Sequence, residues 1–478
     1  MTQLSRRTVL KGGTALTGGA LLGGPFQGVA AAWAGADEQQ PTRDVPCYGP
    51  LRGTPDKADG VGRLALPKDF KYRSFNPAGS LLSGGAVTPG RHDGMACFDG
   101  PRGDFILVRN HEINGPVKAM GNTDTAYDEM AGGGTVTLRV GPHGKVRRAR
   151  ISLNGTQNNC SGGPMPWGSW VTCEETVNGP DVGNDFTGQD NKLLRQKHGY
   201  IFEVPVGGRA ERLPIRSAGR FAHEAAAYDP HTEAIYLTED NFAFPSGFYR
   251  YLPPKDPRLV KSILDGGALQ MLAVRNSADQ DLSGHQAPRT TYDVAWVTID
   301  DPDPDFAPGT TNDQAISAVG DQGRARGAAR FSRLEGAVYD AGLIYFTSTQ
   351  GGAQTDEPPA GFGKGRGQVW AYDPRAEQLH LIYESPSKQV LDLPDNITVS
   401  PSGALVLCED GPEGNLVRGV TRKGNIFDFA RNVIEGKEDE EFAGSTFSPD
   451  GKTLFVNIQS SQGLTFAIWG PWSRGPFG

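Results

Sequence analysis

Two features are missing from this 478-residue sequence, and each absence excludes a class of function. Beyond residue 34 no apolar run is long enough to span a bilayer, so a stable membrane span is not expected. There is also no sustained basic run, and the formal net charge is −8. Because nucleic-acid binding depends on clustered positive charge, nucleic acid is not expected as a partner.

Cysteine is scarce as well, with five residues in the chain. In an oxidising compartment an odd number leaves at least one thiol unpaired. A thiolate bound to a metal is protected from oxidation, and Cys173 is the candidate for that role. Pairing among the remaining cysteines stays open: Cys47, Cys97, Cys160 and Cys408.

The N-terminus has the features of an export signal. Residues 5–11 read SRRTVLK and precede a Gly-rich, mildly apolar stretch, with small residues from Ala30 to Ala34. We expect residues 1–34 to be a twin-arginine signal peptide; an ordinary Sec signal or a basic tail is the alternative. The translocation machinery would then be a partner during export, and the mature protein would be periplasmic or secreted. Because this pathway moves folded proteins, it favours a metalloprotein.

The composition predicts an all-β fold. The chain has 65 Gly and 35 Pro, and its apolar residues lie in short runs between turn signals. Several segments have the form strand, tight turn, strand, and two of the turns, at Val399 and Phe447, start 48 residues apart. That spacing is close to one four-stranded propeller blade. We therefore predict a β-propeller of about six blades; a pair of β-sandwiches is the alternative.

The domain organisation follows from the same pattern. Residues 35–65 are expected to be a polar lead-in, and residues 66–478 the propeller. A polar, Pro-rich stretch at residues 275–330 interrupts the repeats and is interpreted as an insertion between blades. Within it, residues 312–319 are compatible with a helix that starts from an Asn cap.

The strands that end in carboxylates are the main functional signal. Residues 159–175 read NCSGGPMPWGSWVTCEE, so a predicted strand ends on Cys173, Glu174 and Glu175. A thiol beside carboxylates suits a transition metal with a hard cation nearby, although a buried Cys with two solvated Glu is the simpler alternative. Similar strand ends recur at residues 108–112, 221–224, 236–241, 332–336, 394–396 and 407–411.

If these strands converge on one axis, their ends would form a highly negative cavity. Such a cavity would be unstable without bound cations. The sequence therefore predicts metal sites in the central cavity of the propeller.

With these motifs in view, the chain resembles the PhoX-type alkaline phosphatases, which are exported β-propeller metalloenzymes. The segments that carry the resemblance are NCSGG…PWGSWVTCEE, GRFAHEAA, YLTEDN, FSRLEG, PDN…CEDG and EFAGSTFSPDGKTLFVNIQ. The resemblance implies ferric iron and calcium as cofactors and small-molecule phosphate monoesters as substrates. From the chemistry of these residue types, our hypothesis is that a metal-bound oxygen is the nucleophile, without a covalent Ser or Thr intermediate.

The resemblance also implies a set of metal ligands. Cys173 would bind iron, with Glu174 beside it. Glu224 is expected as a further ligand and Glu239 as a second possibility. The remaining expected ligands are Glu335, Asp395, Asn396 and Asp410, with Glu409 as a competitor of Asp410.

Two polar residues are expected to contact the phosphate group. Arg333 would bind it with its planar guanidinium, with a structural ion pair as the alternative role. The phosphate-binding Asn is expected to be Asn159, and Asn158 also qualifies.

Several neighbouring residues are assigned less directly. His223 is not chosen as a ligand, and Cys408 is expected to pack in the core. For Asn110, His111 and Glu112, lining the cavity and closing a turn are equally compatible. Structural roles are expected for Glu441, Asn457 and Gln459.

Two other functions remain compatible with the sequence. One is a calcium-dependent propeller lactonase or diesterase, which needs no thiolate. The other is a non-catalytic exported propeller that binds a protein or glycan. The protein is expected to be a monomer.

Overall fold

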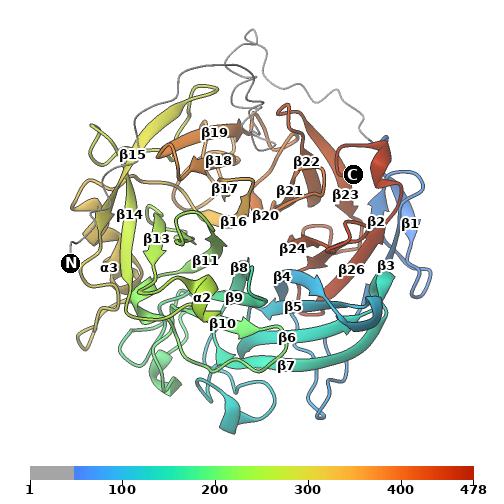
Figure 1. Ribbon diagram of the computed structural model, residues 1–478, viewed down its shortest axis with the longest axis horizontal. Coiled ribbons are helices and arrows are strands. Elements are labelled where there is room, and N and C mark those ends of the chain that lie inside the picture. Colours follow the sequence, from blue (N-terminus) through green and yellow to red (C-terminus); the bar gives the residue numbers. More distant parts are fainter. Residues whose placement is uncertain (1–47) are drawn as a thin grey trace, which may run out of the picture.

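The computed structural model describes residues 48–478, and its strands form six blades around one central axis (Figure 1). This confirms the predicted all-β propeller of about six blades. The expected signal peptide at residues 1–34 lies outside the described residues. Cys47 lies outside them too, and the other four cysteines are free thiols.

Each blade is an antiparallel sheet, numbered here in chain order by its innermost strand. Blade 1 contains β4 (His92–Asp99), β5 (Phe105–His111), β6 (Gly133–Val140) and β7 (Val146–Thr156). Blade 2 contains β8 (Asn159–Met165), β9 (Ser169–Glu174) and β10 (Ile201–Pro205). Blade 3 contains β11 (His223–Tyr228), β12 (Ile235–Glu239), β13 (Phe248–Leu252) and β14 (Ala268–Val274). Blade 4 contains β16 (Leu334–Asp340), β17 (Leu343–Ser348), β18 (Gln368–Asp373) and β19 (Gln378–Glu384). Blade 5 contains β20 (Pro394–Val399), β21 (Leu405–Glu409), β22 (Leu416–Val420) and β23 (Ile426–Asn432). Blade 6 contains β24 (Phe442–Phe447), β25 (Leu454–Ile458) and β26 (Leu464–Trp469).

The N-terminal part of the described chain completes the last two blades. The segment expected to be a polar lead-in contains β1 (Arg52–Pro55) and β2 (Gly62–Leu66), and β2 pairs with β23 of blade 5. The next strand, β3 (Lys71–Phe75), pairs with β26 of blade 6. Strands from both ends of the propeller are therefore hydrogen-bonded together, which closes the ring.

The expected insertion at residues 275–330 is more ordered than its composition suggested. Its strand β15 (Thr291–Thr298) pairs with β14 on one side and β19 on the other, so it joins blades 3 and 4 into one nine-stranded sheet. It also contains helix α3 (Asn312–Arg324), which is longer than predicted. The N-cap is Thr311 rather than Asn312, and it forms a capping box with Gln314.

The core lies between adjacent blades, where the apolar faces of neighbouring sheets pack together. One apolar cluster joins blades 2 and 3 through Ile201, Phe221 and Tyr249, and another joins blades 5 and 6. The innermost strands contact one another around the axis in the order β4, β8, β11, β16, β20, β24 and back to β4. Side chains at corresponding positions of these strands are thereby brought close together.

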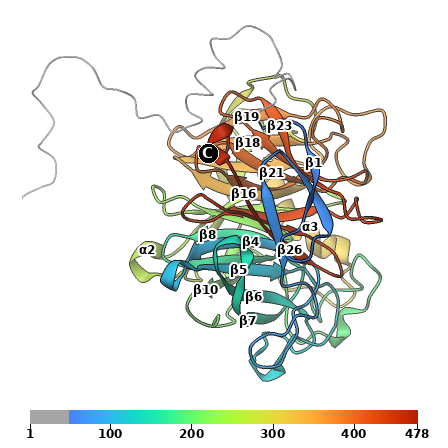
Figure 2. The same cartoon turned by 90° about the vertical axis from the view of Figure 1, so that its right-hand side faces the viewer.

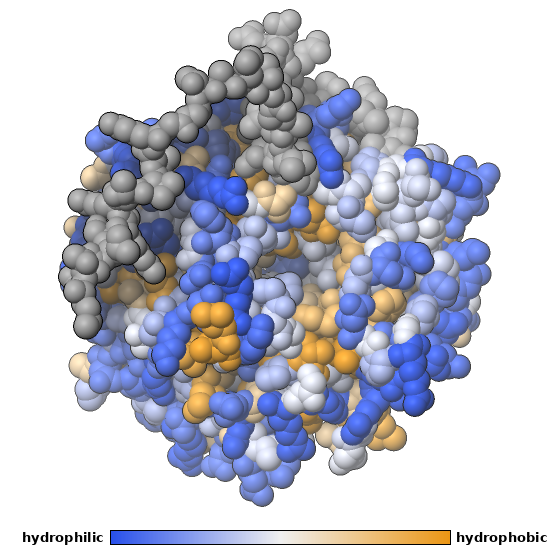
Figure 3. Space-filling model, viewed as in Figure 1, coloured by the Kyte–Doolittle hydropathy of each residue, from blue (hydrophilic) through white to orange (hydrophobic). Residues whose placement is uncertain are grey.

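The two faces of the disc differ. The short helix α2 (Pro257–Val260) and helix α3 lie on opposite faces (Figure 2). The face that carries α2 is mostly hydrophilic, with an apolar patch over α2, where Leu259 and Val260 are exposed (Figure 3). The one-turn 3-10 helices lie in loops: Pro101–Gly103, Thr123–Thr125, Pro142–Gly144, Asn191–Leu193, Arg216–Ala218 and Trp472–Arg474.

Candidate metal centre

All six innermost strands carry a β-bulge near their start, and this repeated irregularity builds the site. In each blade two residues of the inner strand lie opposite one residue of the next strand. Bulges re-aim side chains and are frequent beside active sites. The first bulge residues, in ring order, are Asp93, Cys160, Glu224, Glu335, Asp395 and Gly444.

The inner strands approach each other closely at these bulges. A Cβ added to Gly94 would lie 2.6 Å from Cα of Ser161, and one added to Gly336 would lie 2.6 Å from the amide nitrogen of Ile397. Larger residues at these second bulge positions would therefore push the blades apart. The small residues keep the ring narrow and bring the first bulge residues together.

A second set of acidic side chains lies at neighbouring strand ends. The residue that follows the second strand is acidic in four blades, and a glutamate directly precedes the inner strand of blade 6. These residues are Glu112, Glu175, Asp240, Asp410 and Glu441.

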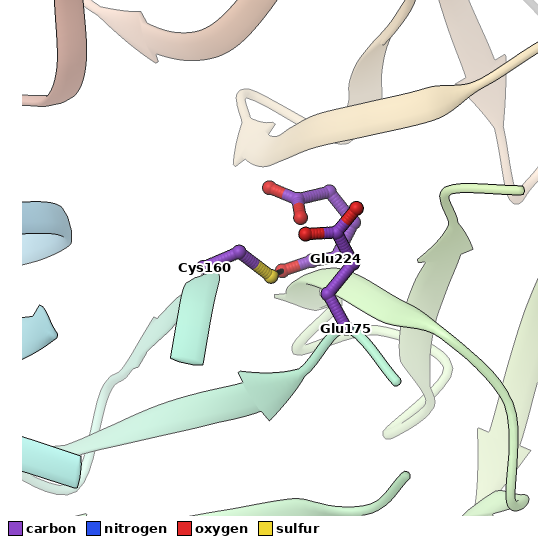
Figure 4. A group of neighbouring side chains, drawn as sticks. All are labelled: Cys160, Glu175 and Glu224. Carbon is purple, nitrogen blue, oxygen red and sulfur yellow. Dashed lines mark hydrogen bonds between the residues drawn. The ribbon is translucent and has the colours of Figure 1, made fainter. Parts of the chain in front are cut away.

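Three groups of these side chains have geometry suitable for metal ions, with the ligand atoms of each group within 4.8 Å of one another. Figure 4 shows the first group, in which Cys160, Glu175 and Glu224 point toward one another from β8, the end of β9 and β11. The other two groups contain only carboxylates: Glu224, Glu335 and Asp395, then Asp395, Asp410 and Glu441. Shared members connect all three groups into one cluster.

The charges of this cluster are poorly balanced by the protein. Burial, followed by the charge of Asp410, raises the pKa of Asp395 to about 8. Burial, and then the neighbouring carboxylates, also raise the pKa values of Glu224, Glu335 and Glu441 well above their usual range. For the Cys160 thiol, burial and then Glu224 raise the pKa. The ionised cluster is therefore unfavourable unless cations enter it.

Arg333 is the cation that lies beside the cluster. Its Nη2 donates to Oδ2 of Asp240 at 2.8 Å and to Oε1 of Glu335 at 2.7 Å. Although burial opposes its charge, these two carboxylates raise the pKa of Arg333. The backbone of Arg333 has a φ of 45°, in the left-handed region that non-glycine residues seldom occupy. This conformation directly precedes the bulge that carries Glu335.

A pocket of about 400 Å³ leads to the cluster and is lined by Arg333, Asn158, Glu112, Glu175 and Asp240. Its lining also includes Asn312 at the start of α3, so its mouth lies on the α3 side of the disc. Several apolar residues surround the outer part of the pocket: Phe186, Phe242, Phe244 and Ile316. Phe186 is 73% exposed and Phe242 is 52% exposed, which is unusual for large apolar side chains.

The structure brings together five of the side chains expected from the sequence. Glu224, Glu335, Asp395 and Asp410 belong to the ligand groups, and Arg333 lies beside them. Asn158 lines the pocket, and the other expected residues have contacts outside these groups.

The thiol of the cluster is Cys160 and not Cys173. Cys173 lies opposite the bulge of blade 2, and its side chain packs in the apolar cluster with Ile201 and Phe221. It belongs to none of the three ligand groups found in the described residues. The physical reason is the bulge, which turns Cys160 toward the axis and leaves the partner residue facing the blade interior.

Glu174 and Glu239 are also directed away from the axis. Glu174 accepts hydrogen bonds from the backbone nitrogens of Gln157 and Gly199 and lies 2.6 Å from Nδ1 of His198. Glu239 accepts from the Tyr249 hydroxyl at 2.8 Å. Because side chains alternate along a strand, the residue after each of these glutamates faces the cavity instead.

The two asparagines of the prediction have structural contacts. Asn159 is fully buried, accepts a hydrogen bond from Oγ1 of Thr156 and donates one to Oγ1 of Thr172. Asn396 donates to Oγ of Ser161 at 3.1 Å and so ties blade 5 to blade 2. Asn158, the alternative to Asn159, lines the pocket.

Five acidic residues of the cavity were not chosen as ligands from the sequence: Asp93, Glu112, Glu175, Asp240 and Glu441. Glu441, expected to be structural, belongs to a ligand group. Aligning the strand ends VTCEE, LTED and LCED would have shown that one position, held by Glu175, Asp240 and Asp410, recurs in three blades.

The donor chemistry of the cluster fits the metals that the resemblance implied. A thiol with carboxylates suits a transition metal such as iron, whereas groups made only of carboxylates suit a hard cation such as calcium. In addition, Oδ1 of Asn158 is buried and has no hydrogen-bond partner in the described part of the chain. An acceptor in this state is a suitable further ligand or water contact.

The fold and the site define a β-propeller with an acidic central cavity. The family model of alkaline phosphatase PhoX matches residues 47–462, so the chain belongs to this family. It is accordingly a metal-dependent phosphatase. A search of curated proteins gives no match.

One solved structure supports the fold, and two others have lower similarity. A complex of Pseudomonas fluorescens PhoX with vanadate, a transition state analogue, has a TM-score of 0.61 and 18% sequence identity, with 89% of this chain and 98% of that chain covered. A virginiamycin B lyase from Staphylococcus aureus has a TM-score of 0.38 and 11% identity, covering 84% of this chain and 99% of its own. A gluconolactonase from Xanthomonas campestris has a TM-score of 0.35 and 13% identity, covering 90% and 100%. The last two values are too low to carry a functional argument.

Within residues 48–478, no helix has the length and apolar character needed to cross a membrane.

Proposed function

We propose that the protein hydrolyses phosphate monoesters in the pocket above the acidic cluster, with iron at the thiol-containing group and calcium at the carboxylate groups. The observation that carries this proposal is the connected set of three ligand groups beside a buried arginine. One group contains a thiol and two do not, so a single cavity offers sites of two chemical kinds.

The protein's own residues have distinct tasks in this proposal. Arg333 binds the phosphate group through Nη1, because its Nε and Nη2 donate to Asp240 and Glu335. Asp240 and Glu335 hold the guanidinium in place through their hydrogen bonds. Asn158 contributes a neutral polar contact at the pocket wall.

The carboxylates and Cys160 hold the cations. When bound, the cations supply Lewis-acid polarisation of the phosphate ester and activation of water. The chain thus provides binding, orientation and a closed site, while the charge of the transferring group is neutralised by Arg333 and the cations.

The mouth of the pocket selects the leaving group. Phe186, Phe242 and Ile316 offer apolar contacts just outside the phosphate position, and the carboxylates around the cavity oppose further negative charge. An ester with one phosphate and an aromatic or apolar alcohol fits this environment best. Esters with additional anionic groups fit it worst.

Export in the folded state is part of the same proposal. The segment at residues 5–11 supports the twin-arginine pathway, which allows the metals to enter before export. We propose a monomeric protein in the periplasm or outside the cell.

The monoester activity is tested with p-nitrophenyl phosphate and bis(p-nitrophenyl) phosphate under identical conditions. The proposal predicts that the monoester is the better substrate and that chelation abolishes its turnover. Faster cleavage of the diester would contradict the proposal. Retention of full activity after exhaustive chelation would refute the metal requirement.

A further inference from the structure

A second pocket, of about 880 Å³, lies at the rim of the propeller and shares no lining residue with the pocket above the acidic cluster. Its floor is residues 148–154 of β7, the outermost strand of blade 1 (Figure 1). Its walls are the loops at residues 83–86, 121–125 and 207–212. We call it the rim groove.

The walls of the rim groove are fixed to the edge of β7. The backbone nitrogen of Ser83 donates to the carbonyl of Ala149 at 2.8 Å, and that of Ala210 donates to the carbonyl of Ser152 at 3.0 Å. The two loops are therefore anchored on the same strand, three residues apart, and the groove between them is a built feature of the fold.

The charge of the rim groove is of one sign. Four arginines line it, and no carboxylate does, in a chain whose net charge is −8. The acidic residues nearest to it in sequence, Asp124 and Glu211, are not part of the lining. The four arginines are Arg148, Arg150, Arg209 and Arg212.

These arginines are not neutralised by the described residues. Within residues 48–478 none of the four forms an ion pair; Arg150 donates to the carbonyl of Val206 and Arg212 to that of Ala126. Arg148 and Arg150 lie two residues apart on a regular part of β7 and so project from the same face. Burial, and then the charges of Arg148 and Arg209, lower the pKa of Arg150.

We propose that the rim groove is a second anion-binding site that takes a ligand with two or more phosphoryl groups. Several guanidinium groups can each bind phosphate oxygens in a fork, and together they suit a multiply charged ligand better than a single small anion. The volume of the groove exceeds that of one phosphate ion and accommodates linked phosphates. The site is separate from catalysis, since it lies on the outer strand of a blade and not on the axis.

The test uses labelled methylenebisphosphonate in equilibrium dialysis, because its P–C–P linkage is not a phosphate ester. The protein is the metal-loaded chain. The wild type is expected to bind one equivalent in the rim groove in addition to any bound at the central cavity, with affinity falling as salt rises. The double variant Arg148→Ala, Arg150→Ala should bind methylenebisphosphonate in the rim groove with at least tenfold lower affinity.

The matched control is the double variant Arg102→Ala, Arg375→Ala. Both residues are exposed and lie outside the rim groove, so this variant loses the same charge elsewhere. It should bind like the wild type, and both double variants should keep the wild-type kcat/KM for p-nitrophenyl phosphate. Equal binding by all three proteins, or an equal loss in both double variants, would overturn the site.

Two further arms test the ligand class. Inorganic phosphate should bind the rim groove at least tenfold more weakly than the bisphosphonate; equal affinity would refute the requirement for two phosphoryl groups. The variant Arg148→Lys, Arg150→Lys retains the charge but lacks the fork, and intermediate binding is expected. Wild-type binding by this variant would contradict recognition by guanidinium forks.

Discussion

The sharpest prediction concerns which thiol binds the metal. The sequence predicted Cys173 as the metal-binding thiol, whereas the structure places Cys160 in the ligand group. The two thiols lie in the same blade, on adjacent strands, and both are buried, so serine substitutions at the two positions form a matched pair. We expect Cys160→Ser to lose iron and phosphatase activity, with little change in stability when the metal-free proteins are compared. We expect Cys173→Ser to keep both and to lose stability.

The magnitudes follow from the surroundings of each sulfur. Sγ of Cys160 lies 3.2 Å from the carbonyl oxygen of His223, so a serine hydroxyl has a hydrogen-bond acceptor there and the folding cost should stay within about 1 kcal/mol. Cys173 packs with Ile201 and Phe221, where a hydroxyl costs about 1–3 kcal/mol if it finds no partner. Loss of a metal ligand should lower kcat/KM by a factor of about 100 or more, because an outer contact to a ligand alone contributes about 10–100-fold.

The assay combines three measurements on each variant: iron per chain, kcat/KM for p-nitrophenyl phosphate and the urea midpoint of unfolding. The reasoning is refuted if Cys173→Ser loses iron while Cys160→Ser retains it. It is equally refuted if both variants retain iron and full activity, since the thiol would then have no role at the metal centre.

Three further predictions concern the phosphate contact, the pocket mouth and a buried ion pair. Arg333→Ala should lower kcat/KM by about 10–150-fold, equivalent to about 1.5–3 kcal/mol for a charged hydrogen bond, while iron and calcium contents stay unchanged; loss of metal would instead assign Arg333 a purely structural role. Phe186→Ala with Phe242→Ala should reduce the ratio of kcat/KM for p-nitrophenyl phosphate to that for glycerol phosphate by about tenfold, and an unchanged ratio would show that the mouth does not select the leaving group. For His198, burial opposes the charged form, but the carboxylates of Glu174 and Asp128 raise the pKa of His198 to about 9. The charged His198 therefore stabilises the fold fully below pH 6.5, and this contribution is lost above pH 9. The free energy of unfolding should fall across this window in the wild type and fall less in His198→Gln. Identical pH profiles for the two proteins would contradict the ion pair.

The sequence predicted the fold well because its signals are local. The short apolar runs and Pro/Gly turns of strand pairs such as residues 394–409 are properties of neighbouring residues, and they repeat along the chain. The pairing of β2 with β23 and the bridging role of β15 depend on contacts between distant segments, and no local pattern signals them.

The site was predicted less completely, because its residues were selected one by one. At each strand end two adjacent residues are acidic or polar, and only the alternation of the strand decides which one faces the axis. Asp410 belongs to a ligand group, whereas Glu174 and Glu239 are directed into internal hydrogen bonds and the residue after each of them faces the cavity. The bulge that turns Cys160 inward has no sequence signal of its own, so the thiol further along the motif was chosen.

The central claim is that one cavity holds both a transition metal and hard cations. The most direct measurement is the iron and calcium content per chain of protein exported through its native route, together with p-nitrophenyl phosphate turnover with and without added calcium. The account predicts both elements in the same protein and turnover that depends on calcium. If the protein contains calcium but no iron and still hydrolyses p-nitrophenyl phosphate in a calcium-dependent way, the result would contradict the assignment of Cys160, Glu175 and Glu224 to a catalytic metal.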